Sequence, residues 1–189
     1  MQGGNALETL TVKRNEGKKE IKTAFVFSCP GQEELKSGKL VNGQTGKNLD
    51  GMLSILKQQY PDIFPSADRY DYRITNSSEN VHYKALDNRS EPKTKEITAP
   101  ENLKRLYDDL CGYEYIITFG RCAALAVEEM LGNNNISGVK TMYSRHLSFL
   151  SLNSSIKTDI NGEPIPRGDK NGTYKRLEVA AKNISDQLV

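Results

Sequence analysis

Cysteine and histidine are scarce in this chain of 189 residues, which contains three cysteines and two histidines. The cysteines, Cys29, Cys111 and Cys122, are odd in number and widely separated, with no Cys-x-x-Cys pair and no histidine at metal-ligand spacing. Disulfide frameworks and cysteine-held metal centres are recognised by such counts and spacings. We therefore expect a reduced, cytoplasmic protein without a cysteine-held metal site.

Long apolar runs are also absent. A membrane-spanning helix needs about 20 consecutive apolar residues, and no run in this sequence approaches that length. The N-terminal sequence, MQGGNALETL, lacks the basic and apolar regions of a signal peptide. These two absences predict a protein with no membrane partner.

Charge of one sign is not concentrated in the chain as a whole, because 26 Lys and Arg residues nearly balance 24 Asp and Glu residues. The net charge of +2 is too small to indicate a nucleic-acid partner by itself. Between residues 138 and 176, however, seven basic residues stand against three acidic ones, which gives a local charge of +4. Either a phosphate-facing surface or a solvated loop would explain this excess.

The apolar residues that are present predict alternating strands and helices. Short runs rich in β-forming residues predict strands over residues 24–27, 71–76 and 115–120. Apolar residues at helical spacing predict helices over residues 46–56, 101–110, 121–131 and 174–188. Such alternation is typical of a three-layer α/β/α sandwich with a mainly parallel sheet. We expect this fold as a single domain over residues 23–189, after an N-terminal arm of residues 1–22, with polar, irregular insertions over residues 81–98 and 152–173.

A break at the end of the first predicted strand indicates where a ligand binds. Pro30 lacks the N–H that a strand ladder needs, and Gly31 readily adopts backbone angles that other residues avoid, so the strand ends in a turn. In an open α/β sheet, ligands bind at the carboxyl ends of the strands. Asn76 ends the second predicted strand, and its amide can read the edge of a planar base, although Asn is also a common turn residue.

Three segments, taken together and in this order, resemble the uracil-DNA glycosylase superfamily. The first is Cys29-Pro30-Gly31 with Glu34 and the glycines that follow, which is similar to the branch with an Ala-Pro-Gly turn. The second is Ile74-Thr75-Asn76, and the third is the run from His146 to Ser151, HLSFLS, which is similar to a His-Pro-Ser-Pro-Leu-Ser segment. The resemblance spans residues 25–151 and implies an α/β/α fold that hydrolyses an N-glycosidic bond in DNA.

The resemblance also implies a role for each matched residue. His146 is expected to stabilise the departing base and Asn76 to discriminate it. Glu34 or Glu33, the nearest acids to the turn, is our candidate for positioning the attacking water. The other residues expected at the base are Ser28, Cys29, Gly31, Gln32 and Val41. Those expected at the DNA are Gly43, Gly46, Arg145, Ser148, Leu150 and Ser151, with Leu150 filling the space that the flipped base leaves in the stack.

No lysine is placed for Schiff-base chemistry, so we expect a monofunctional glycosylase that needs no cofactor. We further expect it to act on DNA as a monomer.

The sequence departs from the superfamily pattern at three points. Ser28 and Cys29 stand where an acid or Asn holds the water, Leu147 and Phe149 replace two prolines, and the cysteines of an iron–sulfur cluster have no counterparts. These departures and the polar insertions favour a modified pyrimidine over plain uracil. One hypothesis is a hypermodified base of viral DNA, which would give the protein a role in antiviral defence.

Two other classes of function remain open. One is a nucleic-acid-binding module that keeps the fold without catalysis, which the missing acid at Ser28 and Cys29 favours. The other is an α/β hydrolase that acts on free nucleosides or nucleotides, whose binding would be insensitive to DNA and to salt.

Overall fold

A four-stranded parallel sheet forms the centre of the computed structural model, which describes residues 10–134 and 136–189. The strands are β1 (Thr23–Phe27), β2 (Arg73–Asn76), β3 (Tyr115–Phe119) and β4 (Lys140–Ser144), in the spatial order β2-β1-β3-β4. The central strand β1 pairs in parallel with both β2 and β3, so that Phe25 lies between Ile74 and Ile117. The predicted α/β/α sandwich with a parallel sheet is thereby confirmed.

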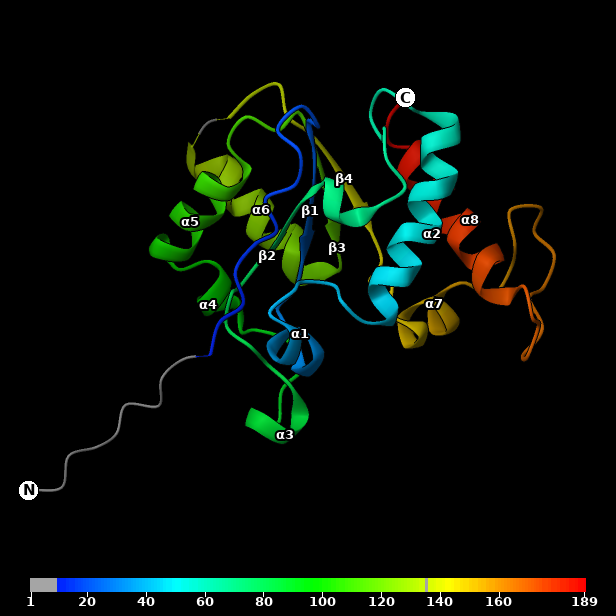
Figure 1. The fold of residues 1–189 in the computed structure, drawn as a ribbon, viewed down its shortest axis with the longest axis horizontal. Coiled ribbons are helices and arrows are strands. Elements are labelled where there is room, and N and C mark those ends of the chain that lie inside the picture. Colours follow the sequence, from blue (N-terminus) through cyan, green and yellow to red (C-terminus); the bar gives the residue numbers. More distant parts are fainter. Residues whose placement is uncertain (1–9, 135) are drawn as a thin grey trace, which may run out of the picture.

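Helices cover both faces of the sheet (Figure 1). On one face lie α2 (Gln44–Gln59) and α8 (Gly172–Ser185), and on the other lie α5 (Pro100–Leu110) and α6 (Arg121–Asn134). Side chains alternate between the faces along a strand, so Phe25 and Phe27 join the core under α2 and α8. Ala24 and Val26 join the second core, under α5 and α6. None of the described helices is long and apolar enough to cross a membrane.

Several elements differ from the sequence-based expectation. The last strand, β4, was not predicted, because only Met142 and Ser144 along it are buried and no apolar run marks it. The predicted insertions and loops contain short helices: α1 (Gln32–Ser37), η1 (Arg69–Asp71), α3 (Lys84–Asp87), α4 (Thr94–Ile97) and α7 (Phe149–Ser155). The start of α7 depends on a local cap, since the Ser148 hydroxyl accepts a hydrogen bond from the Ser151 N–H at 3.3 Å.

Both edges of the sheet are covered by other parts of the chain. Residues 10–22, the part of the predicted N-terminal arm that the structure describes, run beside β2, where Asn15 and Ile74 exchange backbone hydrogen bonds of 2.8 and 3.1 Å. At the opposite edge, the side-chain amide of Gln187 accepts from the Tyr143 N–H at 2.8 Å and donates to the Tyr143 carbonyl at 2.9 Å. Backbone N–H and C=O groups that an edge strand normally exposes to solvent are therefore hydrogen-bonded at Ile74 and Tyr143.

A buried carboxylate fixes the carboxyl half of β2. Asp109 on α5 has no exposed side-chain surface and accepts hydrogen bonds from Arg14 and Arg105, both at 2.6 Å, and from Thr75 at 2.7 Å. Arg105 also donates to the backbone carbonyl of Asn76 at 2.8 Å. This network ties the last residues of β2 to α5 and to the N-terminal segment.

Removing the Asp109 carboxylate should destabilise the protein strongly. We expect Asp109→Ala to lower the free energy of unfolding by about 3 kcal/mol, because it leaves two guanidinium groups without their shared partner. The neighbouring Asp108, whose side chain is 56% exposed and pairs only with Lys104, provides the control. Asp108→Ala should change the free energy by less than about 0.5 kcal/mol, and equal losses from the two variants in urea unfolding would contradict this role for Asp109.

Candidate active site

A pocket of ≈ 220 Å³ opens at the carboxyl ends of the strands, the edge at which the sequence predicts a ligand site. Its wall combines segments that are far apart in the chain: the ends of β1 and β2, the loop before α2, the span after β2, and the loop after β4. The lining residues are Phe27, Cys29, Gly31, Glu34, Val41, Thr45, Asn76, His82, Ser90 and His146.

His146 follows β4 and has one ring nitrogen fixed by the backbone. The Ser148 N–H donates to Nδ1 at 3.2 Å, so Nδ1 carries the lone pair and Nε2 carries the proton. Burial lowers the pKa of His146, and the nearby carboxylate of Glu91 opposes this only in part. At neutral pH the side chain is therefore a neutral imidazole with one N–H donor.

The loop that carries His146 is held by a buried amide on α2. Asn48 donates to the carbonyl of Leu147 at 2.7 Å, and its own oxygen accepts from Gln44 at 3.0 Å. The His146 ring also packs edge-on against Phe27, with ring centroids 6.1 Å apart and planes at 83°. These contacts fix the imidazole from the backbone side and from the pocket wall.

Asn76 lies beside Phe27 in the pairing of β1 with β2. Its backbone carbonyl is held by Arg105, but its side-chain amide has no hydrogen-bond partner within the described residues and faces the pocket. Phe27 stacks on Phe119 with ring centroids 4.5 Å apart and planes at 16°. The pocket thus places the ring of Phe27, which is held by Phe119, next to the Asn76 amide, which can bind a ligand.

Of the two acids expected to position water, only Glu34 lines the pocket. Its Oε2 accepts from the Gly31 N–H at 2.9 Å, which caps α1, and its other oxygen has no protein partner among the described residues. Glu33 is exposed and pairs with Lys36 at 2.9 Å. Gln32, also expected at the base, is exposed at the start of α1 and does not line the pocket.

The loop between α1 and α2 contributes a strained residue to the wall. Val41 has a φ of 51°, a left-handed conformation that is unusual for a β-branched side chain. At Gly46, in the first turn of α2, a Cβ atom would overlap the carbonyl oxygen of Val41. The close approach of these two residues sets the position of Val41, and strain of this kind often accompanies a binding site.

His82 is part of the pocket wall that sequence reasoning missed. Its Nδ1 lies 2.6 Å from an oxygen of Asp87, and its Nε2 lies 2.9 Å from an oxygen of Glu96. These two contacts, one on each ring nitrogen, hold the imidazole ring in place. His82 was not predicted because its partners come from α3 and α4, two four-residue helices with no readable periodicity.

The carboxylate of Glu96 is the most constrained acid of this cluster. Burial opposes its ionisation, but hydrogen bonds from His82, Asn80 and Ser78 outweigh burial and lower its pKa to about 2. The Glu96 carboxylate is therefore ionised at neutral pH, and both ring nitrogens of His82 are occupied by carboxylate contacts.

The remaining residues expected from the resemblance fall into two groups. Cys29 lines the pocket, where burial raises the pKa of its thiol to about 12, so it is a neutral wall residue. Ser28 is buried beside it, with a hydroxyl that has no partner in the described chain, and is not in the lining. The residues expected at the DNA, Gly43, Gly46, Arg145, Ser148, Leu150 and Ser151, all lie outside the lining.

Among these outer residues, Leu150 is 83% exposed and the adjacent Phe149 is 45% exposed. Both lie in the first turn of α7, three and four residues after His146. In the described part of the chain, no group of three His, Cys, Asp or Glu side chains is arranged to hold a metal ion.

No protein-family model matches the chain, and a search of curated proteins finds no significant match.

The contact between Gly46 and Val41 can be tested with a matched glycine. Gly46→Ala should lower the free energy of unfolding by about 1–3 kcal/mol, because the new methyl group must displace the Val41 carbonyl. Gly132, inside α6, has no atom within 4 Å of a Cβ position and no positive φ, so Gly132→Ala should be neutral or stabilising by up to about 1 kcal/mol. Thermal unfolding of both variants measures the difference, and a fully stable Gly46→Ala protein would show that this contact is not required.

The Glu96 cluster predicts a specific loss of stability in acid. A carboxyl whose pKa is about 2 in the folded protein, against an ordinary value of 4.5, contributes stability above about pH 4.5 that is lost as the pH falls towards 2. We expect Glu96→Gln to lower stability at pH 7 and to flatten the pH dependence of the unfolding free energy over this range. Glu128→Gln, on the exposed face of α6, should retain the wild-type slope, and an unchanged slope in Glu96→Gln would contradict the assignment.

Proposed function

We propose that this protein is a monofunctional DNA glycosylase that flips a modified pyrimidine out of DNA and hydrolyses its N-glycosidic bond. One observation carries the proposal: a single pocket joins Asn76 and His146, which come from two separate segments that resemble the base-reading strand end and the histidine segment of the uracil-DNA glycosylase superfamily. Gly31, Glu34 and Val41, from the first resembling segment, line the same pocket.

The size and chemistry of the pocket suit a nucleobase. Its volume of ≈ 220 Å³ is below the range of about 300–1,000 Å³ typical of pockets for drug-sized ligands, so a base fits while the sugar and phosphates stay outside. Phe27 offers an apolar surface for a ring, and the free amide of Asn76 offers a donor and an acceptor for a pyrimidine edge. A base-sized ligand therefore meets both apolar and polar partners.

The chemical step assigned to His146 follows from its tautomer. When the bond between C1′ and the base nitrogen breaks, the bonding electrons leave with the base, which becomes an anion. The Nε2–H of a neutral imidazole, held by the Ser148 N–H on the opposite nitrogen, can donate to an oxygen of this anion. A preorganised donor in a partly buried site favours the charge-separated transition state and commonly accounts for 10²–10³ in rate.

Water then attacks the cationic C1′ from the other side and loses a proton. Glu34 suits the acceptor role, since one carboxylate oxygen is fixed by the Gly31 N–H while the other has no protein partner among the described residues. Glu33 does not suit it, because it is exposed and outside the lining. The carboxylate of Glu34 orients the water and takes up its proton as the abasic sugar forms.

The outer surface near His146 provides contacts for the DNA. Leu150, at 83% exposure on the first turn of α7, can fill the gap that the flipped base leaves in the stack, because unstacking is less costly when an apolar side chain replaces the base. Backbone N–H groups near Gly43 and Gly46, together with Arg145 and Ser151, are proposed to contact phosphates at the rim.

The pocket wall favours a base with a polar substituent. His82 and Ser90, from the polar insertion over residues 81–98, line the same pocket as the segments that resemble the superfamily. A substituted pyrimidine, such as a hypermodified base of viral DNA, would place its extra polar group against this wall. We propose an antiviral role on this basis. A cytoplasmic location is proposed from the three unpaired cysteines, and the monomeric state stays a proposal.

A second candidate, a catalytically inactive DNA-binding module of this fold, is favoured by one observation. Ser28 and Cys29 supply no acid beside the turn, and half of the Glu34 carboxylate is engaged in capping α1. Base release distinguishes this alternative from the glycosylase, and salt-sensitive binding of DNA distinguishes both from a nucleoside hydrolase.

The proposed function predicts base release from one member of a panel of modified DNAs. The panel carries uracil, hypoxanthine, and oxidised, hydroxymethylated and glucosylated pyrimidines, and abasic sites are detected by alkali cleavage. We expect release of one pyrimidine, with a fall of at least 10²-fold in His146→Ala and a comparable loss in Asn76→Ala.

Asn183→Ala, at an exposed position on α8, is the matched control for Asn76→Ala and should retain full activity. Absence of base release from every substrate, with salt-sensitive DNA binding intact, would overturn the glycosylase and leave the binding module.

A further inference from the structure

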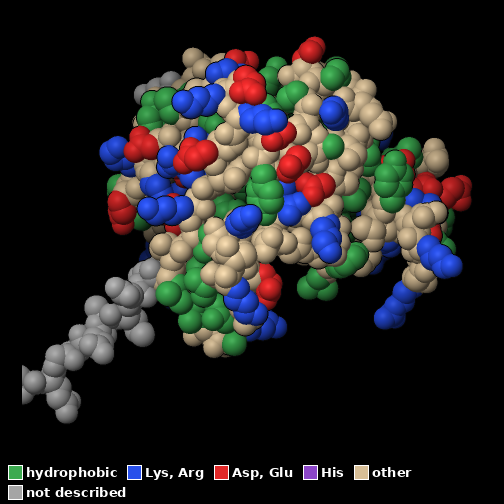
Figure 2. All heavy atoms as spheres, viewed as in Figure 1, with side chains coloured by type: hydrophobic (Ala, Val, Ile, Leu, Met, Phe, Trp, Pro, Cys, Tyr) green, Lys and Arg blue, Asp and Glu red, His purple; other side chains and the backbone are tan. Residues whose placement is uncertain are grey.

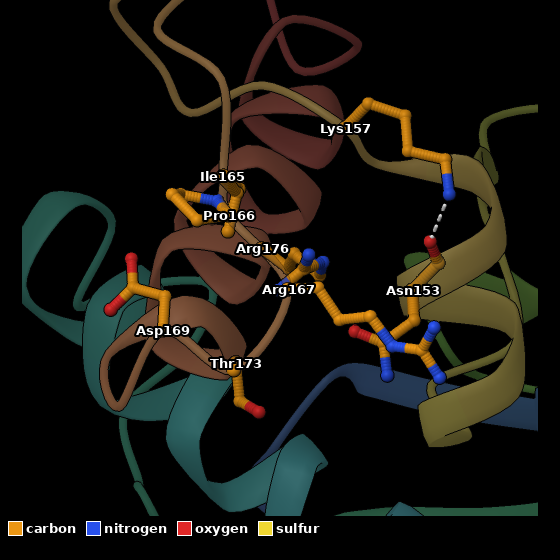
Figure 3. Close-up of a pocket in the computed structure, with 9 residues that line it drawn as sticks. Asn153, Lys157, Ile165, Pro166, Arg167, Asp169, Thr173 and Arg176 are labelled. Atoms are coloured by element: carbon orange, nitrogen blue, oxygen red, sulfur yellow. Dashed lines mark hydrogen bonds between the residues drawn. The ribbon is translucent and has the colours of Figure 1, made fainter.

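A second cavity, of ≈ 580 Å³, lies between α7 and α8 and shares no lining residue with the pocket at His146. We call it the α7–α8 groove. Asn153 of α7, Lys157 and Arg167 of the connecting loop, and Thr173 and Arg176 of α8 line it (Figure 3). In Figure 3, the Arg167 side chain extends across the cavity towards Asn153.

Arg176 is a buried cation without a carboxylate partner. It is 7% exposed, and within the described chain it takes part in no ion pair. Its Nε donates to the Ile156 carbonyl at 3.1 Å and one terminal nitrogen donates to the Gly172 carbonyl at 2.8 Å. The other terminal nitrogen has no partner among the described residues. A buried charge is costly unless it is paired, so this guanidinium, in the wall of a cavity, indicates an anionic ligand.

The other charges of the α7–α8 groove point the same way. Lys157 and Arg167 are exposed cations at its rim, and neither pairs with a carboxylate in the described part of the chain. The one acid in the lining, Asp169, is engaged by Lys175 at 2.7 Å, and its carboxylate points away from the two arginines in Figure 3. Figure 2 shows Lys and Arg side chains together with Asp and Glu side chains on the lobe at the right of the view, so the positive charge is local to the groove and not general to the lobe.

The start of α8 adds to this positive potential. The helix begins at Gly172 with no acidic residue in its first turn, and Thr173 in that turn lines the groove. Helix N-termini and guanidinium groups are both suited to phosphate, which accepts several hydrogen bonds at once. The tetrahedral phosphate group therefore matches the donors better than a single carboxylate does.

We propose that the α7–α8 groove binds a phosphate group, and that the backbone of the DNA strand supplies it. The position of α7 favours the DNA strand as the source. Leu150, in the first turn of α7, faces the DNA in the proposed function, and Asn153, in the next turn of the same helix, lines the groove. This choice of source rests on the proposed function, whereas the phosphate site itself rests on Arg176 and its neighbours.

The test compares the salt dependence of DNA binding in three variants. Arg176 also joins Ile156 to Gly172, so the substitutions are made at the rim: Arg167→Ala, Arg167→Lys and the control Lys170→Ala. Lys170 is an exposed cation of the same loop outside the groove lining. The slope of log K against log[salt] should become shallower by about 0.7–0.9 in Arg167→Ala, the value for one lost phosphate contact, and should be restored in Arg167→Lys and unchanged in Lys170→Ala.

A second measurement identifies the source of the phosphate. Inorganic phosphate at constant ionic strength should raise the melting temperature of the wild type, relative to chloride, more than that of Arg167→Ala. Stabilisation by phosphate with no change in the DNA slope would keep the phosphate site and reject the strand as its source. Equal slopes in all variants without stabilisation, or an equal change in Lys170→Ala, would overturn the proposal.

Failure of the proposed function is recognised separately. His146→Ala should lose base release and keep the wild-type salt slope, because its side chain contacts the base and not a phosphate. A wild type that releases no base but shows the slope change in Arg167→Ala would reject the glycosylase and retain the phosphate site.

Discussion

The parallel pairing of β1 with both β2 and β3 is the constraint on which the rest of the structure depends. It buries all five residues of β1, and it brings the carboxyl ends of the strands to one edge. Phe27 and Asn76 become neighbours only through this register, and the buried Asp109 network then fixes the end of β2. The pairing register of the strands therefore determines which side chains meet at the base of the pocket.

The sequence predicted the buried parts of this architecture and missed those that depend on long-range contacts. The strands β1 and β3 are apolar runs and could be recognised, whereas β4 alternates at an edge and could not. Asn76 and His146 were predicted as partners and do line one pocket. Glu33 and Glu34 could not be separated, because the choice depends on α1 beginning at Gln32, which turns Glu34 back to Gly31. The His82 cluster joins residues of two helices too short to be recognised.

The two histidines of the chain have opposite roles that their surroundings impose. His82 has both nitrogens bonded to carboxylates, whereas His146 has a backbone N–H on one nitrogen and the pocket on the other. Burial without a carboxylate in hydrogen-bond contact lowers the pKa of His146. Within one cavity, His82 is thus held by its two contacts, whereas His146 keeps one nitrogen available as a hydrogen-bond donor.

The covered edges of the sheet have a consequence for self-association. Asn15 pairs with β2 as a strand would, and the Gln187 amide occupies the Tyr143 N–H and carbonyl on β4. An incoming strand from another molecule must displace these bonds before it can form its own. The contacts of Asn15 and Gln187 thus disfavour the pairing of either edge strand with a strand of another molecule, which is the first step of aggregation through β-sheets.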